Sequence, residues 1–122
     1  MINIKFNKEL KILEVEFTGD ISLKELIDYG EKIRISNDLP RELKILTDAR
    51  ESVYKISHND LRVVVMELKK QIKPYKSVKT AVIQTKPVET ALSMLVNWEG
   101  QIDGYEHQVF ATRHAALNWL LY

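Results

Sequence analysis

Segments with the apolar period of strands alternate with segments of helical period along the whole chain, and this alternation limits the fold more than any other feature. Near the N-terminus, two runs with a two-residue apolar period flank a short polar turn at residues 7–9, which predicts an antiparallel hairpin. The apolar residues of these runs are Ile2, Ile4, Phe6, Leu13, Val15 and Phe17. Gly19 and Asp20 then interrupt the pattern, and we expect the second strand to end there.

Four helical segments follow, and each begins at a capping residue or an early proline. These signals are Ser22 with Glu25, Ser57 with Asp60, Pro87, and Thr112. We expect the second helix to end at Pro74 and to bury Leu61, Val64, Val65, Leu68 and Ile72. We expect the third helix to bury Val88, Ala91, Leu92 and Leu95. Three apolar runs between the helices predict strands at residues 43–47, 78–83 and 107–111.

The predicted element order is therefore ββαβαβαβα. Strands that alternate with helices favour an α/β fold with right-handed crossovers, so we predict a mixed, mostly parallel sheet of about five strands with helices packed on it. The chain has 122 residues, of which 45% are hydrophobic and 29% charged, and it contains no linker or low-complexity tract. These values predict a single domain over residues 1–122.

Composition excludes several classes of function. Eighteen basic and seventeen acidic residues give a formal net charge of +1, so overall charge selects no class of partner. The absence of cysteine excludes disulfides, thiolate metal sites and a cysteine nucleophile. No stretch is apolar for the about 7–15 residues of a signal peptide or the roughly 20 of a membrane helix. We expect a cytoplasmic protein with no integral membrane segment.

The whole chain resembles the STAS-like domains, in particular the small single-domain SpoIIAA-like proteins of bacteria. The stretches that carry the resemblance are Thr-Gly-Asp-Ile-Ser at 18–22, Leu-Lys-Ile-Leu-Thr-Asp-Ala-Arg at 43–50, Val-Lys-Thr-Ala-Val-Ile at 78–83, and Val-Phe at 109–110 with Ala-Ala-Leu-Asn-Trp-Leu at 115–120. The resemblance implies a SpoIIAA-like fold and a non-enzymatic regulatory module that binds a partner protein. Since some relatives are compared with lipid-binding Sec14-type domains, it leaves a small-ligand site, for an anion or a lipid, as the alternative.

Some members of this family are switched by serine phosphorylation at an Asp-Ser-Ser/Thr-Gly stretch that starts the second helix. The matching stretch here is Ile-Ser-His-Asn-Asp-Leu at 56–61, which lacks the glycine and the second hydroxyl. Ser57 is therefore the only phosphoacceptor candidate, and we interpret it first as an N-cap.

A second set of candidate residues follows two predicted strands. Asp48 and Arg50 come after residues 43–47, and Thr85 and Lys86 come after residues 78–83. Because ligands of open α/β sheets bind beyond the carboxyl ends of strands, these residues could form a crevice with Ser57 and His58 for an anion or a partner. The simpler interpretation is that Asp48 and Arg50 hold a loop together by an ion pair.

The remaining motifs predict no catalytic residue, no metal site and no cofactor. The three histidines have no metal-ligand spacing, and the chain lacks both a nucleophile elbow and a glycine-rich phosphate loop. One stretch is rich in lysine and contains no acidic residue, with lysines at 69, 70, 73, 76, 79 and 86. It predicts a solvated face or a patch that binds an acidic protein. The absence of arginine in this stretch argues against binding of nucleic acid. Trp98, Trp119 and the last residues predict either core or the surface of a homodimer or partner.

Overall fold

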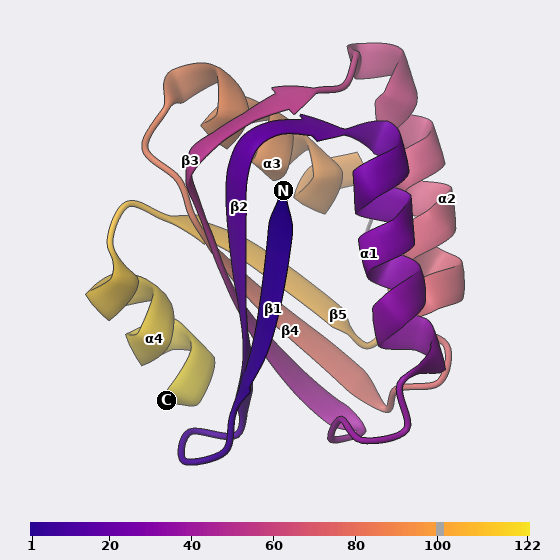
Figure 1. Cartoon of the computed structure of the whole chain (residues 1–122), viewed down its shortest axis with the longest axis vertical. Coiled ribbons are helices and arrows are strands. Elements are labelled where there is room, and N and C mark those ends of the chain that lie inside the picture. Colours follow the sequence, from indigo (N-terminus) through magenta and orange to yellow (C-terminus); the bar gives the residue numbers. More distant parts are fainter. Residues whose placement is uncertain (100–101) are drawn as a thin grey trace.

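A five-stranded sheet runs through the centre of the molecule (Figure 1). The computed structural model describes residues 1–99 and 102–122, and the side chains of residues 95–99 lie outside that description. The strands are β1 (Ile2–Asn7), β2 (Ile12–Ser22), β3 (Glu42–Lys55), β4 (Ser77–Ile83) and β5 (Tyr105–Phe110), in that spatial order. β1 pairs with β2 in antiparallel fashion and every other pair is parallel. The predicted mixed α/β sheet and the predicted element order are confirmed.

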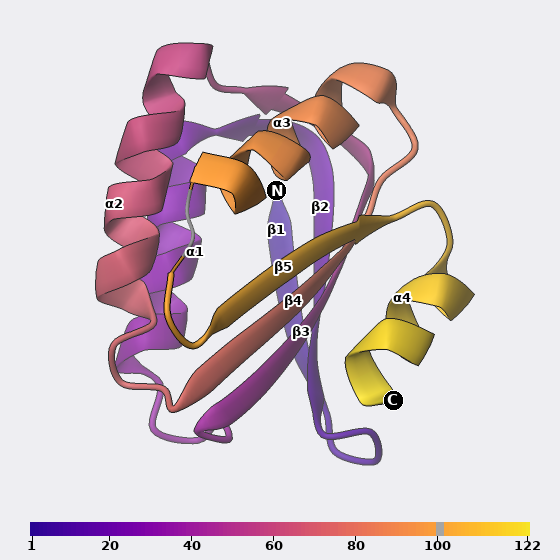
Figure 2. The same cartoon turned by 180° about the vertical axis from the view of Figure 1, so that it is seen from behind.

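Helices cover both faces of this sheet (Figures 1 and 2). One face carries α1 (Leu23–Ile35), α2 (Leu61–Gln71) and α3 (Pro87–Glu99), with a short 3-10 turn, η1 (His58–Asp60), ahead of α2. The other face carries α4 (Arg113–Leu121). Two separate apolar cores result, because successive side chains of a strand point to opposite faces.

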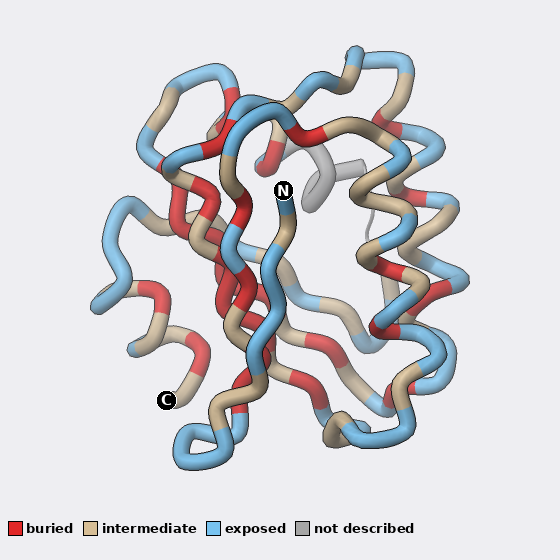
Figure 3. Tube along the Cα trace, viewed as in Figure 1, coloured by how far each residue is buried: buried red, intermediate tan, exposed pale blue. Residues whose placement is uncertain are grey.

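The first core lies under α1, and the second lies under α4. In β4, Val78 and Val82 belong to the first core, whereas Ala81 and Ile83 belong to the second with Leu120 of α4. Figure 3 shows that buried residues concentrate in the middle strands, while much of β1 at the sheet edge is exposed. The edge position explains why Ile4 is 38% exposed although it belongs to the apolar side of its strand.

Two strands are longer than their sequence patterns predict. β2 continues through Gly19 to Ser22, because Gly19 adopts a left-handed backbone with φ +69° and stays paired with Ser52. The prediction that this strand ends at Gly19 is therefore wrong. β3 runs on to Lys55, so Asp48 and Arg50 lie inside a strand and not in a loop after it.

A β-bulge lets β3 continue. Glu16 pairs with Asp48 and Thr18 with Glu51, so β3 advances three residues where β2 advances two. The extra residue reverses which face the following side chains point to. Ile45 and Thr47 precede the bulge, and Tyr54, which follows it, points to the same face as they do.

The third helix begins at Pro87 as predicted, but two of the four residues predicted to be buried on it are exposed. Val88 is 67% exposed and Ala91 is exposed, whereas Glu89 and Ser93 are buried. Leu92 is half-buried, and Leu95 lies outside the described residues. Apolar residues occur on several sides of this helix, so their spacing alone does not select the side that packs.

Candidate functional site

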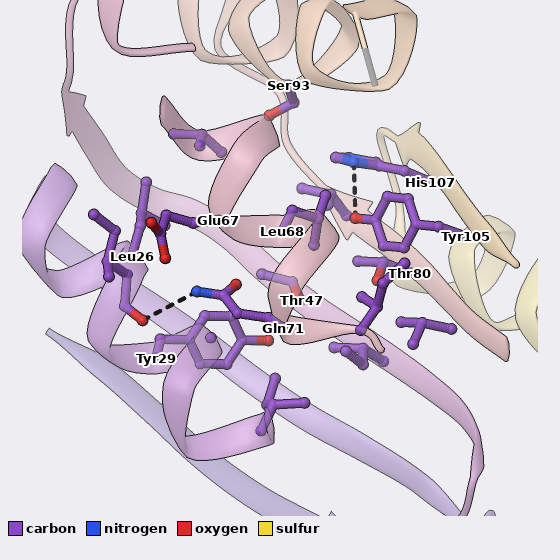
Figure 4. Close-up of a pocket in the computed structure, with 18 of the residues that line it drawn as sticks. Leu26, Tyr29, Thr47, Glu67, Leu68, Gln71, Thr80, Ser93, Tyr105 and His107 are labelled. Atoms are coloured by element: carbon purple, nitrogen blue, oxygen red, sulfur yellow. Dashed lines mark hydrogen bonds between the residues drawn. The ribbon is translucent and has the colours of Figure 1, made fainter. Parts of the chain in front are cut away.

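An apolar cavity of about 170 Å³ lies between the sheet and the three helices that cover one of its faces (Figure 4). The sheet supplies its floor through Phe17, Ile45, Thr47, Tyr54, Val78, Thr80, Val82, Tyr105 and His107. The helices supply its walls, chiefly through Leu26, Tyr29, Ile33, Val64, Leu68, Gln71, Leu92 and Ser93. The walls are mostly hydrocarbon, with a few polar groups that converge on the interior, which is the usual composition of a small-molecule site.

Strand register places the polar groups of the floor side by side. Thr80 pairs with His107 across β4 and β5, and Val78 pairs with Tyr105. Paired residues of parallel strands share a face, so Thr80, Tyr105 and His107 form one cluster at the β5 side of the cavity. Figure 4 shows Tyr105 and His107 together there.

Gln84 fixes the bulge that brings Tyr54 to the floor. The Gln84 side-chain amide donates to the carbonyl oxygen of Ala49 at 2.7 Å, and the Ser52 hydroxyl donates to the same oxygen at 2.7 Å. The side-chain oxygen of Gln84 accepts from the backbone amides of Thr85 and Lys86 at 2.9 and 3.1 Å. Gln84 is 2% exposed, so this one side chain joins the bulge to the start of α3.

A glycine allows the wall between α1 and α2 to close. A Cβ on Gly30 would lie 1.9 Å from Oε1 of Gln71, so only glycine leaves room for that amide. Nε2 of Gln71 donates to the Ile27 carbonyl at 3.3 Å, which holds the two helices together beside the cavity. Tyr75 donates its hydroxyl to the Ile33 carbonyl and so satisfies an acceptor near the C-terminal end of α1.

Burial perturbs the titratable groups around the cavity. It raises the pKa of Tyr29 and of Tyr54, and it raises the pKa of Tyr105 to about 12. The cause is that a charged phenolate is poorly solvated in an apolar environment. The Tyr54 hydroxyl lies 3.4 Å from the Ser93 hydroxyl. Burial also lowers the pKa of His107 to about 4, so the imidazole is neutral at pH 7.

His107 carries a polar atom without a partner. Nδ1 lies 3.4 Å from the Tyr105 hydroxyl, but buried Nε2 has no hydrogen-bond partner among the described residues. Unsatisfied buried side-chain atoms are uncommon and costly in folded proteins.

The predicted crevice residues lie elsewhere. Arg50 and Asp48 pair with each other through two hydrogen bonds, Nε to Oδ1 at 3.0 Å and a terminal nitrogen to Oδ2 at 2.7 Å. The side-chain hydrogen bond from Arg50 lowers the pKa of Asp48. The Lys86 ammonium donates to the Ser52 carbonyl at 2.8 Å, and Thr85 is exposed. Anion binding by these residues stays a prediction.

Ser57 and His58 are exposed at the turn before α2. Ser57 is the N-cap of η1 and not of α2 itself, and its backbone amide donates to the Asp60 carboxylate at 2.8 Å. Phosphorylation of Ser57 stays a prediction.

The lysine run does not form one continuous face. Lys79 donates to the Trp119 carbonyl at 2.9 Å and lies over the Trp119 ring on the α4 side, whereas Lys70 lies on α2 within 3.5 Å of Glu67. Trp119 is half-buried against Phe110, and Tyr122 is 95% exposed. Trp98 lies outside the residues whose side chains are described.

The sequence does not predict the cavity, although two polar residues of its floor lie in apolar strand patterns that point them inward. Thr80 stands between Val78 and Val82 in an apolar run, and His107 stands two residues after Tyr105, so alternation points both polar side chains inward. The predicted apolar stripe of α2 is also only partly buried, since Val64 and Leu68 line the cavity.

Comparison with known proteins supports the fold. No protein-family model matches this sequence, and no curated protein matches it either. A solved structure from Shewanella loihica PV-4, described as an uncharacterized protein from the DUF3478 family with a SpoIIAA-like fold, superposes with a TM-score of 0.62 at 20% identity. The match covers 98% of this chain and 92% of that chain, so the chain has a SpoIIAA-like fold. No helix among the described residues is long and apolar enough to cross a membrane.

Proposed function

We propose that this SpoIIAA-like domain is a non-catalytic module that binds a small apolar molecule in the cavity between its sheet and the helices α1, α2 and α3. The observation that carries the proposal is the cavity itself, which is lined mainly by hydrocarbon and holds about 170 Å³. Engineered apolar cavities of about 150 Å³ bind a benzene molecule. The cavity therefore has room for a ring or a short chain of similar size.

The charges around the cavity favour an apolar ligand over an anion. Among the described lining residues Glu67 is the only acid, and there is no lysine or arginine. A buried anion would lose its hydration without gaining a cationic partner, which is unfavourable. Of the two ligand classes that the resemblance leaves open, the cavity is suited to the lipid-like one.

We expect toluene to raise the melting temperature of the protein and Val64→Trp to abolish the effect. Val64 is half-buried on α2 and lines the cavity, so an indole at this position would occupy the space for ligand. Binding at ten times the dissociation constant stabilises a protein by about 1.4 kcal/mol, or roughly 5 °C for a domain of this size. Differential scanning fluorimetry with and without toluene measures the shift.

Val63→Trp is the matched control, since Val63 is 38% exposed on the same helix and does not line the cavity. The control variant should keep the toluene response of the wild type. A protein that shows no response to toluene, or an equal response in both tryptophan variants, would contradict binding in this cavity.

Protein interaction through α2 and α3 is a second candidate function, in line with what the resemblance implies. Four apolar side chains on these two helices are exposed to between 38% and 67%: Val63, Met66, Val88 and Met94. Exposed apolar side chains on two neighbouring helices can supply the apolar part of an interaction surface.

We expect the average molar mass to rise with protein concentration in light-scattering measurements, and Met66→Lys combined with Met94→Lys to hold it at the monomer value. A charge at these positions would have to be desolvated in any contact between copies. Asn3→Lys combined with Asn118→Lys, at exposed positions outside α2 and α3, controls for the two added positive charges. A monomer mass for the wild type at every concentration would exclude a homodimer.

A further inference from the structure

The unpartnered Nε2 of His107 indicates what kind of molecule the cavity takes, and this step rests on the proposed function. Nε2 is buried without a hydrogen-bond partner among the described residues, and His107 lines the cavity. A buried imidazole nitrogen normally finds a partner, since leaving it unsatisfied costs stability. A ligand that offers the complementary group would remove that cost.

The neighbours of His107 determine which hydrogen bond Nε2 can make. The Tyr105 hydroxyl lies 3.4 Å from Nδ1 of His107. The phenolic O–H can donate to Nδ1, which then acts as the acceptor. A neutral imidazole has a single N–H, so Nε2 then carries the proton and acts as a donor.

The surroundings also determine the charge of the ligand. Glu67 on α2 lines the same cavity with a side chain that is 26% exposed, and no lysine or arginine is among the described lining residues. An anionic ligand would meet this carboxylate in a poorly hydrated space. A neutral ligand avoids the repulsion and still accepts the hydrogen bond from Nε2.

We propose that the cavity takes a compact neutral molecule with one hydrogen-bond acceptor, such as a carbonyl oxygen, and that Nε2 of His107 donates to this acceptor while the apolar body packs against Leu68 and Val82. The volume of about 170 Å³ limits the ligand to about seven non-hydrogen atoms, by comparison with the six of benzene in about 150 Å³.

The test compares cyclohexanone with methylenecyclohexane, which has the same shape but carries a CH₂ group in place of the carbonyl oxygen. Dissociation constants are measured by titration calorimetry or by amide chemical shifts, for the wild type and for His107→Phe. We expect the ratio of the two dissociation constants to change about 10-fold in favour of methylenecyclohexane when His107 is replaced, because the ketone oxygen loses its donor. Benzoate should not bind at pH 7.

Two further measurements test the position of the imidazole proton and the role of Tyr105. Long-range ¹H–¹⁵N correlation of the imidazole should show the proton on Nε2 and none on Nδ1. Tyr105→Phe should reduce the preference for the ketone without abolishing binding of methylenecyclohexane, since it removes only the group that bonds Nδ1.

The possible outcomes separate this inference from the proposed function. If both molecules bind the wild type and His107→Phe leaves their ratio unchanged, the donor role of His107 is wrong while ligand binding stands. A proton on Nδ1 would also overturn that role. If neither molecule nor toluene binds, the proposed function itself fails.

Discussion

Replacing Gln84 with alanine should lower the free energy of unfolding by about 3 kcal/mol, measured by urea denaturation at pH 7. The side chain is 2% exposed and makes three hydrogen bonds, one to the Ala49 carbonyl and two from the amides of Thr85 and Lys86. Alanine would leave both amides without this acceptor and would create a void in addition. The Ala49 carbonyl would keep only the bond from Ser52.

Gln84→Glu separates the donor role of this side chain from its acceptor role. A carboxylate can still accept from the two amides, but it cannot donate to the Ala49 carbonyl, and it would place a charge in a buried position. Its pKa in the folded protein should therefore be raised, so the variant is destabilised as the pH rises above the unfolded value of about 4.3. Relative to the wild type, we expect it to recover stability as the pH is lowered.

The same substitutions should weaken ligand binding, because Gln84 supports the bulge that turns Tyr54 toward the cavity. The toluene-induced rise in melting temperature should be smaller in Gln84→Ala than in the wild type. Ser52→Ala removes the other donor to the Ala49 carbonyl but leaves the amides of Thr85 and Lys86 satisfied, so it should cost less than Gln84→Ala. An equal cost would show that the amide contacts contribute nothing.

The fold could be predicted because its determinants are local in the sequence. Ser22 and Glu25 form the predicted capping box, with the Ser22 oxygen accepting from the Glu25 amide at 3.2 Å, and the Thr112 hydroxyl caps α4. The strand predicted at 78–83 matches β4 within one residue. Each of these signals acts within a few residues, so the chain reveals it without knowledge of its tertiary contacts.

The bulge and the cavity could not be predicted in the same way. The sequence predicts a loop at Asp48 and Arg50 because polar residues interrupt the apolar run. The strand instead continues through a bulge, and the Ala49 carbonyl in this bulge accepts from Gln84, which is 35 residues away. The cavity needs the contact between Gly30 and Gln71 and the register of β4 with β5. These contacts join segments that are far apart in the sequence, and hydrophobic periodicity cannot predict such contacts.

Lowering the pH from 7 to about 4 should reduce the free energy of unfolding, and His107→Phe should remove up to about 3 kcal/mol of that loss. Burial lowers the pKa of His107 from 6.5 to about 4. Between these values the unfolded chain binds a proton that the folded protein does not, so stability falls as the pH falls through this range. A shift of one pKa unit corresponds to about 1.4 kcal/mol, which gives the size of the effect.

Urea denaturation at pH 7, 5.5 and 4.5 measures the difference between the wild type and His107→Phe. Phenylalanine has no proton to gain and no unsatisfied nitrogen, so the variant should be at least as stable as the wild type at pH 7 and clearly more stable near pH 4.5. The lowered pKa values of Asp48 and Glu14 also make acid destabilising, but both proteins share these groups and their effect cancels in the difference.

His114→Asn on α4 controls for the loss of a histidine at an exposed position, and the effect belongs to His107 only if this variant keeps the pH dependence of the wild type. Cyclohexanone should raise the free energy of unfolding of the wild type at pH 7, because a ligand that binds only the folded protein stabilises it. If the wild type and His107→Phe lost stability in parallel, the imidazole would have to be hydrated in the folded protein. Water would then satisfy Nε2, and the imidazole would give no reason to expect a ligand with a hydrogen-bond acceptor.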